Sequence, residues 1–211
     1  LVNTNFKFTR YWDYNFTEPT MKMSKADYYS ELEFLIDQAV NRQLVGDVEL
    51  ASYLSGGMDS GTITAISSQK IKNLKTFTCG FDMTSVSKFE LSFDERVTAS
   101  KISSLFGTNH YELLLTSKDM ENSLDMVAWH LEEPRVGQSY PNYCIAKKAS
   151  EYVKVILSGA GGDELFGGYP WRYFVTANSK NFNEYIDNYY IYWQRLLDNS
   201  QLKKIFSPIY N

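Results

Sequence analysis

Two glycine-rich segments carry the residues best suited to chemistry. The first of them reads Ser55-Gly56-Gly57-Met58-Asp59-Ser60. Adjacent glycines allow a tight turn whose N–H groups approach an anion, and a following helix adds the positive end of its dipole. Asp59 would repel a phosphate unless Mg²⁺ lies between the two groups. The segment lacks the lysine of a Walker loop and the third glycine of a dinucleotide fingerprint. A glycine turn with a capping side chain is the alternative interpretation.

The second segment runs from Ser158 to Tyr169 and again places an aspartate, Asp163, behind glycines. If both segments follow parallel strands, they reach the same edge of the sheet and face one crevice. Asp59 and Asp163 could then hold one divalent ion on a polyphosphate. A flexible surface loop is the alternative, but Leu165 and Phe166 would anchor such a loop.

The elements that must position these segments alternate along the chain. Short apolar runs predict strands at 48–54, 75–80, 110–115 and 153–157. Helical spacing predicts helices at 24–44, 62–71, 94–106, from 117 onward, and at 142–151, with Ser24 and Ser117 as N-caps and Gly107 as a C-terminal glycine. This alternation predicts an α/β fold, a mostly parallel sheet sandwiched by helices.

Beyond Tyr169 the chain becomes aromatic and helical. One helical face is predicted to carry Phe182, Tyr185, Ile186, Tyr189, Trp193, Leu196 and Leu197. This face belongs either to a packing helix or to an interface helix, and the sequence does not separate these two interpretations.

Composition limits the classes of function. The 211 residues are 44% hydrophobic and 22% charged with a net charge of −4, so nothing attracts nucleic acid or an anionic membrane. No apolar run reaches the length of a membrane span. Cys79 and Cys144 match no metal or redox spacing and indicate a reducing, cytoplasmic compartment. His110 and His130 also lack ligand spacing and are interpreted as structural.

The two segments resemble the synthetase domain of the glutamine-dependent asparagine synthetase family, which is of the ATP-pyrophosphatase (PP-loop) type. The first matches the pattern SGGxDS and the second the more specific SGxGxDExFGGY. The stretch Ser92-Phe93-Asp94-Glu95 fits as well, and the similarity extends over about residues 10–173. The resemblance implies an adenine nucleotide alpha hydrolase-like fold. It also implies a lead-in segment at 1–20 from an N-terminal glutaminase domain, and a C-terminally truncated synthetase domain at 21–211.

The family's chemistry implies ATP and Mg²⁺ as cofactors. A substrate carboxylate attacks the α-phosphate, pyrophosphate leaves, and ammonia displaces AMP from the acyl-adenylate. By motif, the implied nucleotide-binding residues are Leu54, Ser55, Gly56, Gly57, Asp59, Ser60, Cys79, Gly80, Ser158 and Gly159. The same resemblance assigns Asp59 and Asp163 to Mg²⁺, and these two aspartates with Glu164 to catalysis.

One position departs from the family. Ala160 stands where many members have a carboxylate with an assigned acid/base or substrate role, and a methyl group cannot accept a proton. Either Glu164 or another group serves, or the acceptor is not aspartate. Glu132-Glu133-Pro134 is either a solvated turn or part of the acceptor pocket, and Arg135 is a candidate partner for a substrate carboxylate.

Three functions therefore remain open at the level of sequence: asparagine synthesis, amidation of another carboxylate such as a sugar acid or peptide, and nucleotide binding without catalysis. The expected partners are a small-molecule carboxylate and ammonia from a glutaminase domain outside this chain. The sequence leaves the oligomeric state open, with a homodimer as one option.

Overall fold

The computed structural model describes residues 7–15, 17, 22–82, 84, 94–133, 138–194 and 197–207. Ser92, Phe93, Pro134, Arg135 and Leu196, named in the sequence predictions, lie outside these residues. Contacts divide the chain into two compact units, Leu1–Ala39 and Val40–Asn211. The predicted division between residues 20 and 21 stays a prediction.

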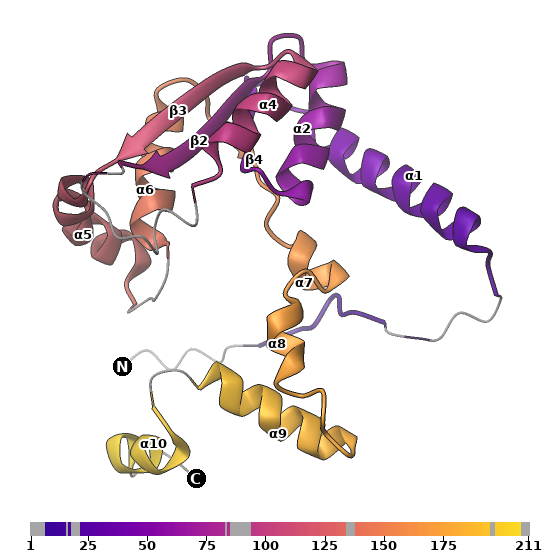
Figure 1. Ribbon diagram of the computed structural model, residues 1–211, viewed down its shortest axis with the longest axis vertical. Helices are drawn as coiled ribbons and strands as arrows, with labels where there is room; N and C mark the ends of the chain where they lie inside the picture. Colours follow the sequence, from indigo (N-terminus) through magenta and orange to yellow (C-terminus); the bar gives the residue numbers. More distant parts are fainter. Residues whose placement is uncertain are drawn as a thin grey trace. The chain divides into compact units, whose positions relative to one another are not determined.

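A four-stranded parallel sheet organises the larger unit (Figure 1). Its strands are β1 (Leu50–Tyr53), β2 (Lys75–Phe81), β3 (Asn109–Leu115) and β4 (Val155–Leu157). The strand order is β3-β2-β1-β4, so the direction of winding reverses between β1 and β4. In the register, Ser52 lies opposite both Thr76 and Leu157. Ligands of open α/β sheets bind where the strand order reverses, beyond the carboxyl ends of the strands.

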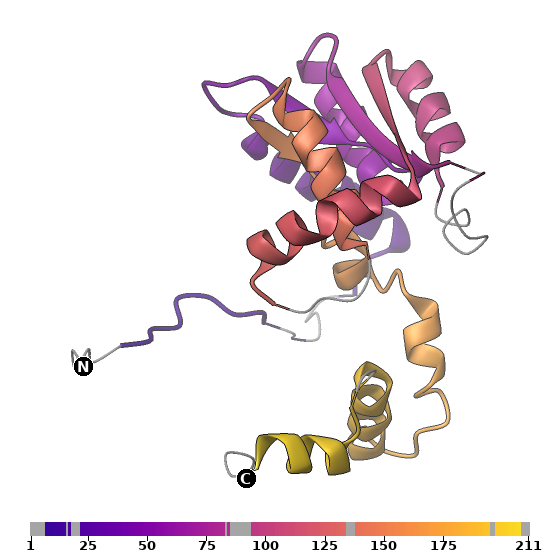
Figure 2. The same ribbon diagram turned by 90° about the vertical axis from the view of Figure 1, so that its left-hand side faces the viewer.

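Helices cover both faces of this sheet (Figure 2). Helices α2 (Met58–Lys70) and α4 (Arg96–Phe106) lie on one face, and α5 (Ser117–Leu131) and α6 (Ser139–Ser150) on the other. The predicted α/β class, with a parallel sheet between helices, is confirmed. Because α2 begins at Met58 rather than Thr62, Asp59 and Ser60 belong to the first helical turn and not to a loop.

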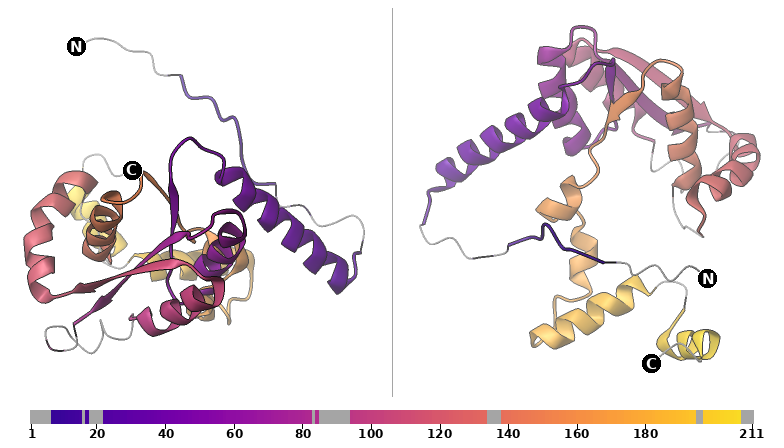
Figure 3. Two further views of the ribbon diagram at one scale, coloured as in Figure 1. Left: turned by 90° about the horizontal axis from the view of Figure 1, so that it is seen from above. Right: turned by 180° about the vertical axis from the view of Figure 1, so that it is seen from behind.

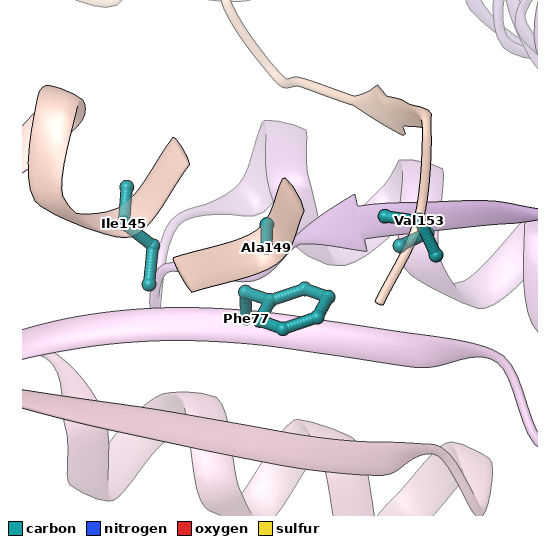
Figure 4. Packing of buried hydrophobic residues seen from close by; sticks show 5 residues of the cluster. Phe77, Ile145, Ala149 and Val153 are labelled. Carbon is teal, nitrogen blue, oxygen red and sulfur yellow. The ribbon is translucent and has the colours of Figure 1, made fainter. Parts of the chain in front are cut away.

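The face under α6 holds an apolar core. Phe77 of β2 packs with Ile145 and Ala149 of α6 and with Val153, as Figure 4 shows. Phe77 is only 1% exposed, and its ring stacks on that of Tyr111 with 5.1 Å between centroids. Burial of this surface provides the main driving force for closing α6 onto the sheet.

The face under α2 and α4 is instead rich in hydroxyl groups. Thr64 of α2 donates to Ser52 of β1 at 3.1 Å, and Thr76 of β2 lies 2.9 Å from the hydroxyl of Thr108. Ser52, Thr64 and Thr76 are fully buried and Thr108 is half-buried, and their mutual hydrogen bonds offset the cost of removing the hydroxyls from water.

Local sequence explains most helix ends. Gly107 adopts a left-handed conformation (φ 62°) at the end of α4, as predicted. Ser24 accepts a hydrogen bond from Asp27 N–H before α1 (Lys25–Gln43), which confirms it as a capping residue. The prediction for Ser117 is wrong, because the N-cap of α5 is Thr116. Its hydroxyl accepts from Asp119 N–H, and the Asp119 carboxylate accepts from Thr116 N–H in return.

The aromatic tail also differs from the prediction of one helix. It contains α8 (Pro170–Phe174), α9 (Phe182–Trp193) and α10 (Asn199–Phe206), so Leu197 lies between two helices. Asp198 explains the break, since its side chain caps α10 by accepting from Gln201 N–H at 2.8 Å. The rings of Phe182, Tyr185 and Tyr189 stack along α9 as their spacing indicated.

Candidate functional site

The segment Ser55–Ser60 leaves the carboxyl end of β1 and is held by its own serines. Ser60 Oγ accepts from Ser55 N–H at 3.1 Å, and Ser55 Oγ accepts from Gly57 N–H at 3.1 Å. The two hydroxyl oxygens are 2.9 Å apart. Ser60 is only 6% exposed and has acceptors in Ser55 Oγ and in the carbonyls of Ser55 and Gly57. These hydrogen bonds fix the position of the half-buried Ser55 hydroxyl at the start of the segment.

The start of α4 lies against Gly56. A β-carbon at this glycine would lie 2.8 Å from Cβ of Thr98 and 3.3 Å from Cβ of Glu95, so a side chain does not fit. The Glu95 carboxylate accepts a hydrogen bond from Gly56 N–H at 3.3 Å. No sequence pattern predicted a role for Glu95 or Thr98 at this segment.

The second glycine-rich segment meets the first at Asp59. Figure 3 shows the chain passing from β4 into the short helix α7 (Gly162–Phe166). A β-carbon at Gly159 would lie 2.8 Å from Ser60 N, and one at Gly162 would clash with the Asp59 carboxylate. The two segments are therefore in contact, as parallel strands predict, and a side chain at either position would displace its neighbour.

Glycines also shape the segment around Asp163. Gly161 and Gly167 have φ of 102° and 68°, a region that other residues rarely adopt. Gly168 N–H donates to the Asp163 carbonyl at 2.9 Å, and a side chain at Gly168 would collide with the Asp163 carboxylate. Asp163 is half-buried by this turn, directly after the glycine that contacts Asp59.

Glu164 and Tyr169 brace the same segment. One Glu164 carboxylate oxygen accepts from Gly161 N–H at 3.1 Å and the other from the Tyr169 hydroxyl at 3.0 Å. A hydrogen bond from its own backbone N–H, followed by those from Tyr169 and Gly161, lowers the pKa of Glu164. Burial and the adjacent carboxylates raise the pKa of Tyr169 to about 12, so its hydroxyl stays protonated and donating. The Arg172 guanidinium lies 3.5 Å above the Tyr169 ring, a favourable cation–π contact.

The ends of β1 and β2 show how an adenosine pocket could form there. The Leu54 side chain is buried, and its N–H donates to the Phe77 carbonyl at 2.9 Å. A side chain at Gly80 would clash with Arg96, so only the backbone of Gly80 is available to contact a ligand there. Burial, and then the proximity of Cys144 and Asp94, raises the pKa of the Cys79 thiol to about 11, so this thiol is protonated at neutral pH and suits packing.

Ala160 and His110 are further candidate residues named from the sequence. Ala160 is exposed next to Ser158, whose hydroxyl accepts from Ala160 N–H at 3.2 Å. His110 is at the amino end of β3, where its Nδ1 lies 2.9 Å from the Thr76 hydroxyl and burial lowers its pKa. A cavity of about 250 Å³ opens between α5 and α6 and includes none of the predicted nucleotide residues. It is lined by Val127, His130, Leu131, Ser139, Asn142 and Tyr143.

Within the described ranges, no group of three or more His, Cys, Asp or Glu side chains converges as a metal cage. No described helix is long and apolar enough to cross a membrane. Two carboxylates on separate segments still suit Mg²⁺, which keeps several waters and takes its other ligands from phosphate oxygens.

Known proteins match this chain at the level of sequence. The model of the asparagine synthase family matches residues 31–209. Glutamine-hydrolyzing asparagine synthetase 1 of Bacillus subtilis is 32% identical over 163 residues, which cover 77% of this chain and 24% of that protein. A putative glutamine-hydrolyzing asparagine synthetase 2 of Methanocaldococcus jannaschii is 32% identical over 162 residues, with coverages of 75% and 30%. The chain thus spans about a quarter of the length of these relatives.

A solved structure with some likeness is glutamine-dependent NAD+ synthetase from Acinetobacter baumannii in complex with adenosine diphosphate. It is 16% identical, with a TM-score of 0.41, and the match covers 72% of this chain and 29% of that one.

Proposed function

Because the chain belongs to the asparagine synthase family, we propose that it activates a carboxylate with ATP for amide formation. The reaction proceeds by attack of the carboxylate on the α-phosphate, release of pyrophosphate and displacement of AMP by ammonia. Asparagine synthesis from aspartate is the leading form of this proposal. Adenylation is needed because it turns a poor leaving oxygen of the carboxylate into a good one.

The contact between the two glycine-rich segments is the observation that carries the proposal. Gly159 and Gly162 lie against Ser60 and Asp59, next to the reversal of strand order between β1 and β4. A phosphate group at this point would meet the N–H groups of the first turn of α2, which have no partners within the helix. Such an arrangement suits a polyphosphate better than an uncharged ligand.

In this proposal, different residues contact different parts of the nucleotide. Ser55, Gly56, Gly57 and Ser60 hold the pyrophosphate portion, with the Ser60 hydroxyl positioning that of Ser55. Backbone groups at Leu54, Cys79 and Gly80 line the adenosine pocket. Ser158 and Gly159 approach the α-phosphate and ribose, since Gly159 already lies beside Ser60.

Asp59 and Asp163 are the proposed holders of Mg²⁺. When bound, the ion would neutralise phosphate charge and favour departure of pyrophosphate. Gly162 fixes the Asp59 carboxylate and Gly168 borders that of Asp163, so both carboxylates are positioned before any ligand arrives.

Glu164 is proposed to serve catalysis by positioning rather than by proton transfer. Its two carboxylate oxygens already accept from Gly161 N–H and the Tyr169 hydroxyl. Its lowered pKa also makes it a weak base. Proton removal from the attacking ammonia then falls to solvent or to a group outside these residues.

Ala160 supports a second candidate, amidation of a carboxylate other than aspartate. Its methyl group is exposed in the second segment, where it offers no charge to pair with the ammonium group of an amino-acid substrate. A sugar acid or a peptide carboxylate lacks that ammonium group near the reacting carbon. A nucleotide-binding module without catalysis is the third candidate.

The partners follow from the same proposal. Ammonia comes from a glutaminase domain outside this chain, the substrate is a small carboxylate, and the compartment is cytoplasmic. A homodimer remains a proposal that no contact in the structure addresses.

Pyrophosphate release by the intact protein tests this function. The assay contains Mg-ATP, ammonium and a panel of carboxylates headed by aspartate. We expect release with one acid of the panel and its loss in Asp59→Asn, while Asp125→Asn on the exposed surface of α5 leaves it unchanged. Release with aspartate identifies an asparagine synthetase, and release with another acid identifies the second candidate.

The other outcomes are equally informative. ATP binding in calorimetry without release for any acid favours the binding module. Absence of ATP binding overturns the proposed function altogether.

A further inference from the structure

Glu95 places a carboxylate on a backbone donor of the first glycine-rich segment. Its Oε2 accepts from Gly56 N–H at 3.3 Å, although 39 residues separate the two in sequence. The contact arises because β2 lies beside β1, so Glu95, directly before α4, reaches the end of β1. A carboxylate and a phosphate oxygen are chemically alike as acceptors of such an N–H group.

Of the three N–H groups that precede α2 in the segment, that of Gly56 has no bond inside the segment. Ser55 N–H donates to Ser60 Oγ and Gly57 N–H donates to Ser55 Oγ, so these two groups are already used. Gly56 N–H donates to Glu95, a residue of another element. A phosphate held by this segment would take its hydrogen bond from the same group.

Contacts other than that of the Glu95 carboxylate also hold the segment in place. Gly56 packs closely on Thr98 through its backbone, with only 2.8 Å between Cβ of Thr98 and the position a β-carbon would take. Asp94, the residue before Glu95, is itself held by the hydrogen bond that its carboxylate accepts from Phe81 N–H at 3.2 Å. The hydrogen bond to Glu95 is long and exposed to water, which makes it weak.

No cation among the described residues neutralises the charge of Glu95. The adjacent Arg96 is committed to Asp94, with Nη2 2.7 Å and Nε 3.0 Å from the same carboxylate oxygen. Across the described part of the chain, Glu95 takes part in no ion pair. A phosphate that approaches Gly56 therefore meets an unpaired negative charge.

We propose that Glu95 is a built-in competitor for the phosphate site, occupying Gly56 N–H until a nucleotide phosphate displaces it. The residue thereby weakens binding of pyrophosphate and of the polyphosphate of ATP. This inference rests on the proposed function, because it concerns the same phosphate site. It gives Glu95 a role in the release of pyrophosphate, since the carboxylate returns to the donor that pyrophosphate leaves.

Two variants of Glu95 separate its charge from its hydrogen bond. Glu95→Gln keeps an oxygen that can accept from Gly56 N–H and removes the charge, whereas Glu95→Ala removes both. Calorimetry measures binding of inorganic pyrophosphate to the intact protein in EDTA and again with Mg²⁺. We expect about fivefold tighter binding without metal for Glu95→Gln, typical of one exposed charge contact, and at least as large a gain for Glu95→Ala. The gain should shrink at 1 M salt because salt screens exposed charges.

Glu121→Gln on the exposed surface of α5 is the matched control and should bind as the parent does. Unchanged or weaker binding in both Glu95 variants overturns the inference, while the proposed function survives if the parent binds pyrophosphate. If the Glu95 variants bind pyrophosphate more weakly only when Mg²⁺ is present, Glu95 is a metal ligand, which also overturns the inference. If neither the parent nor the Glu95 variants bind, the inference and the proposed phosphate site both fail.

Discussion

Gly162 decides where the Asp59 carboxylate lies. Its backbone occupies the space beside both carboxylate oxygens, one of which would be 2.7 Å from a β-carbon at this position. Because Gly162 begins α7 and its φ is not in the left-handed region, alanine fits the backbone there and disturbs mainly Asp59.

Gly162→Ala should therefore affect metal-dependent activity more than stability. We expect Mg²⁺-dependent pyrophosphate release to fall by about tenfold, as for other substitutions that misplace a metal ligand. Gly46→Ala is the control, since no atom of the described residues lies within 4 Å of a β-carbon there. Magnesium titrations of both variants make the comparison, and an unchanged Mg²⁺ dependence in Gly162→Ala would contradict the proposed site.

Asp94 ties the start of α4 to the end of β2. Hydrogen bonds from the Arg96 guanidinium, together with Phe81 N–H, lower the pKa of Asp94 below its ordinary value. A carboxyl group of this kind stabilises the fold above its unfolded pKa of about 4, and the stabilisation disappears as pH falls through the lower folded pKa.

Asp94→Asn should cost about 1 kcal/mol at pH 7, since Asp94 is only partly shielded from water. The variant should also lose less stability than the parent between pH 4 and pH 2. Denaturant unfolding at several pH values measures both effects, with the exposed Asp47→Asn as the control. An acid dependence equal to that of the parent would show that this carboxylate carries no such stabilisation.

Residue patterns predicted part of this site. The serines, glycines and Asp59 of the first segment are consecutive, so their spacing alone indicated an anion site next to a helix. Glu95 and Thr98 could not be found in this way, because they reach Gly56 only through the pairing of β1 with β2. No local signal marks a contact made across two strands.

At the scale of elements, capping decided where sequence expectations succeeded or failed. Ser117 was predicted to cap α5, but the preceding Thr116 forms the reciprocal hydrogen bonds with Asp119. The break between α9 and α10 had a readable signal in Asp198-x-x-Gln201, which is a capping box. The apolar periodicity continued across that break and concealed it.

The cap of α5 gives a paired test. Thr116→Ala should lower the free energy of unfolding by about 1 kcal/mol, because it removes the acceptor for Asp119 N–H. Ser117→Ala, one residue later and exposed, should change it by less than about 0.5 kcal/mol. Chemical denaturation of both variants decides which residue is the cap, and equal losses would contradict the assignment.

At the scale of the whole molecule, the alternation of strands and helices was enough to predict a parallel sheet with helices on both faces. Strand order was not predicted, since it depends on whether each helical crossover places the next strand on one side or the other of β1. The contrast between an apolar face under α6 and a hydroxyl-rich face under α2 and α4 also depends on that arrangement.

Phe77 tests the apolar face. Phe77→Ala should destabilise the larger unit by about 3–5 kcal/mol, since it empties space between β2 and α6. Phe174→Ala in α8, where the side chain is 72% exposed, should cost less than about 0.5 kcal/mol. Urea unfolding followed by circular dichroism compares them, and similar losses would place the core elsewhere.

The strand order has a consequence for how the site comes apart. β1 pairs with a neighbour on each side, whereas β4 has three residues, pairs with β1 alone among the described strands, and leaves Val155 42% exposed. Amide hydrogens of β1 should therefore exchange with deuterium slowly and those of β4 sooner. Local unfolding of β4 would move Asp163 away while Ser55–Ser60 stays attached to β1. Under mildly destabilising conditions, the protein should therefore lose Mg²⁺ binding before it loses phosphate binding.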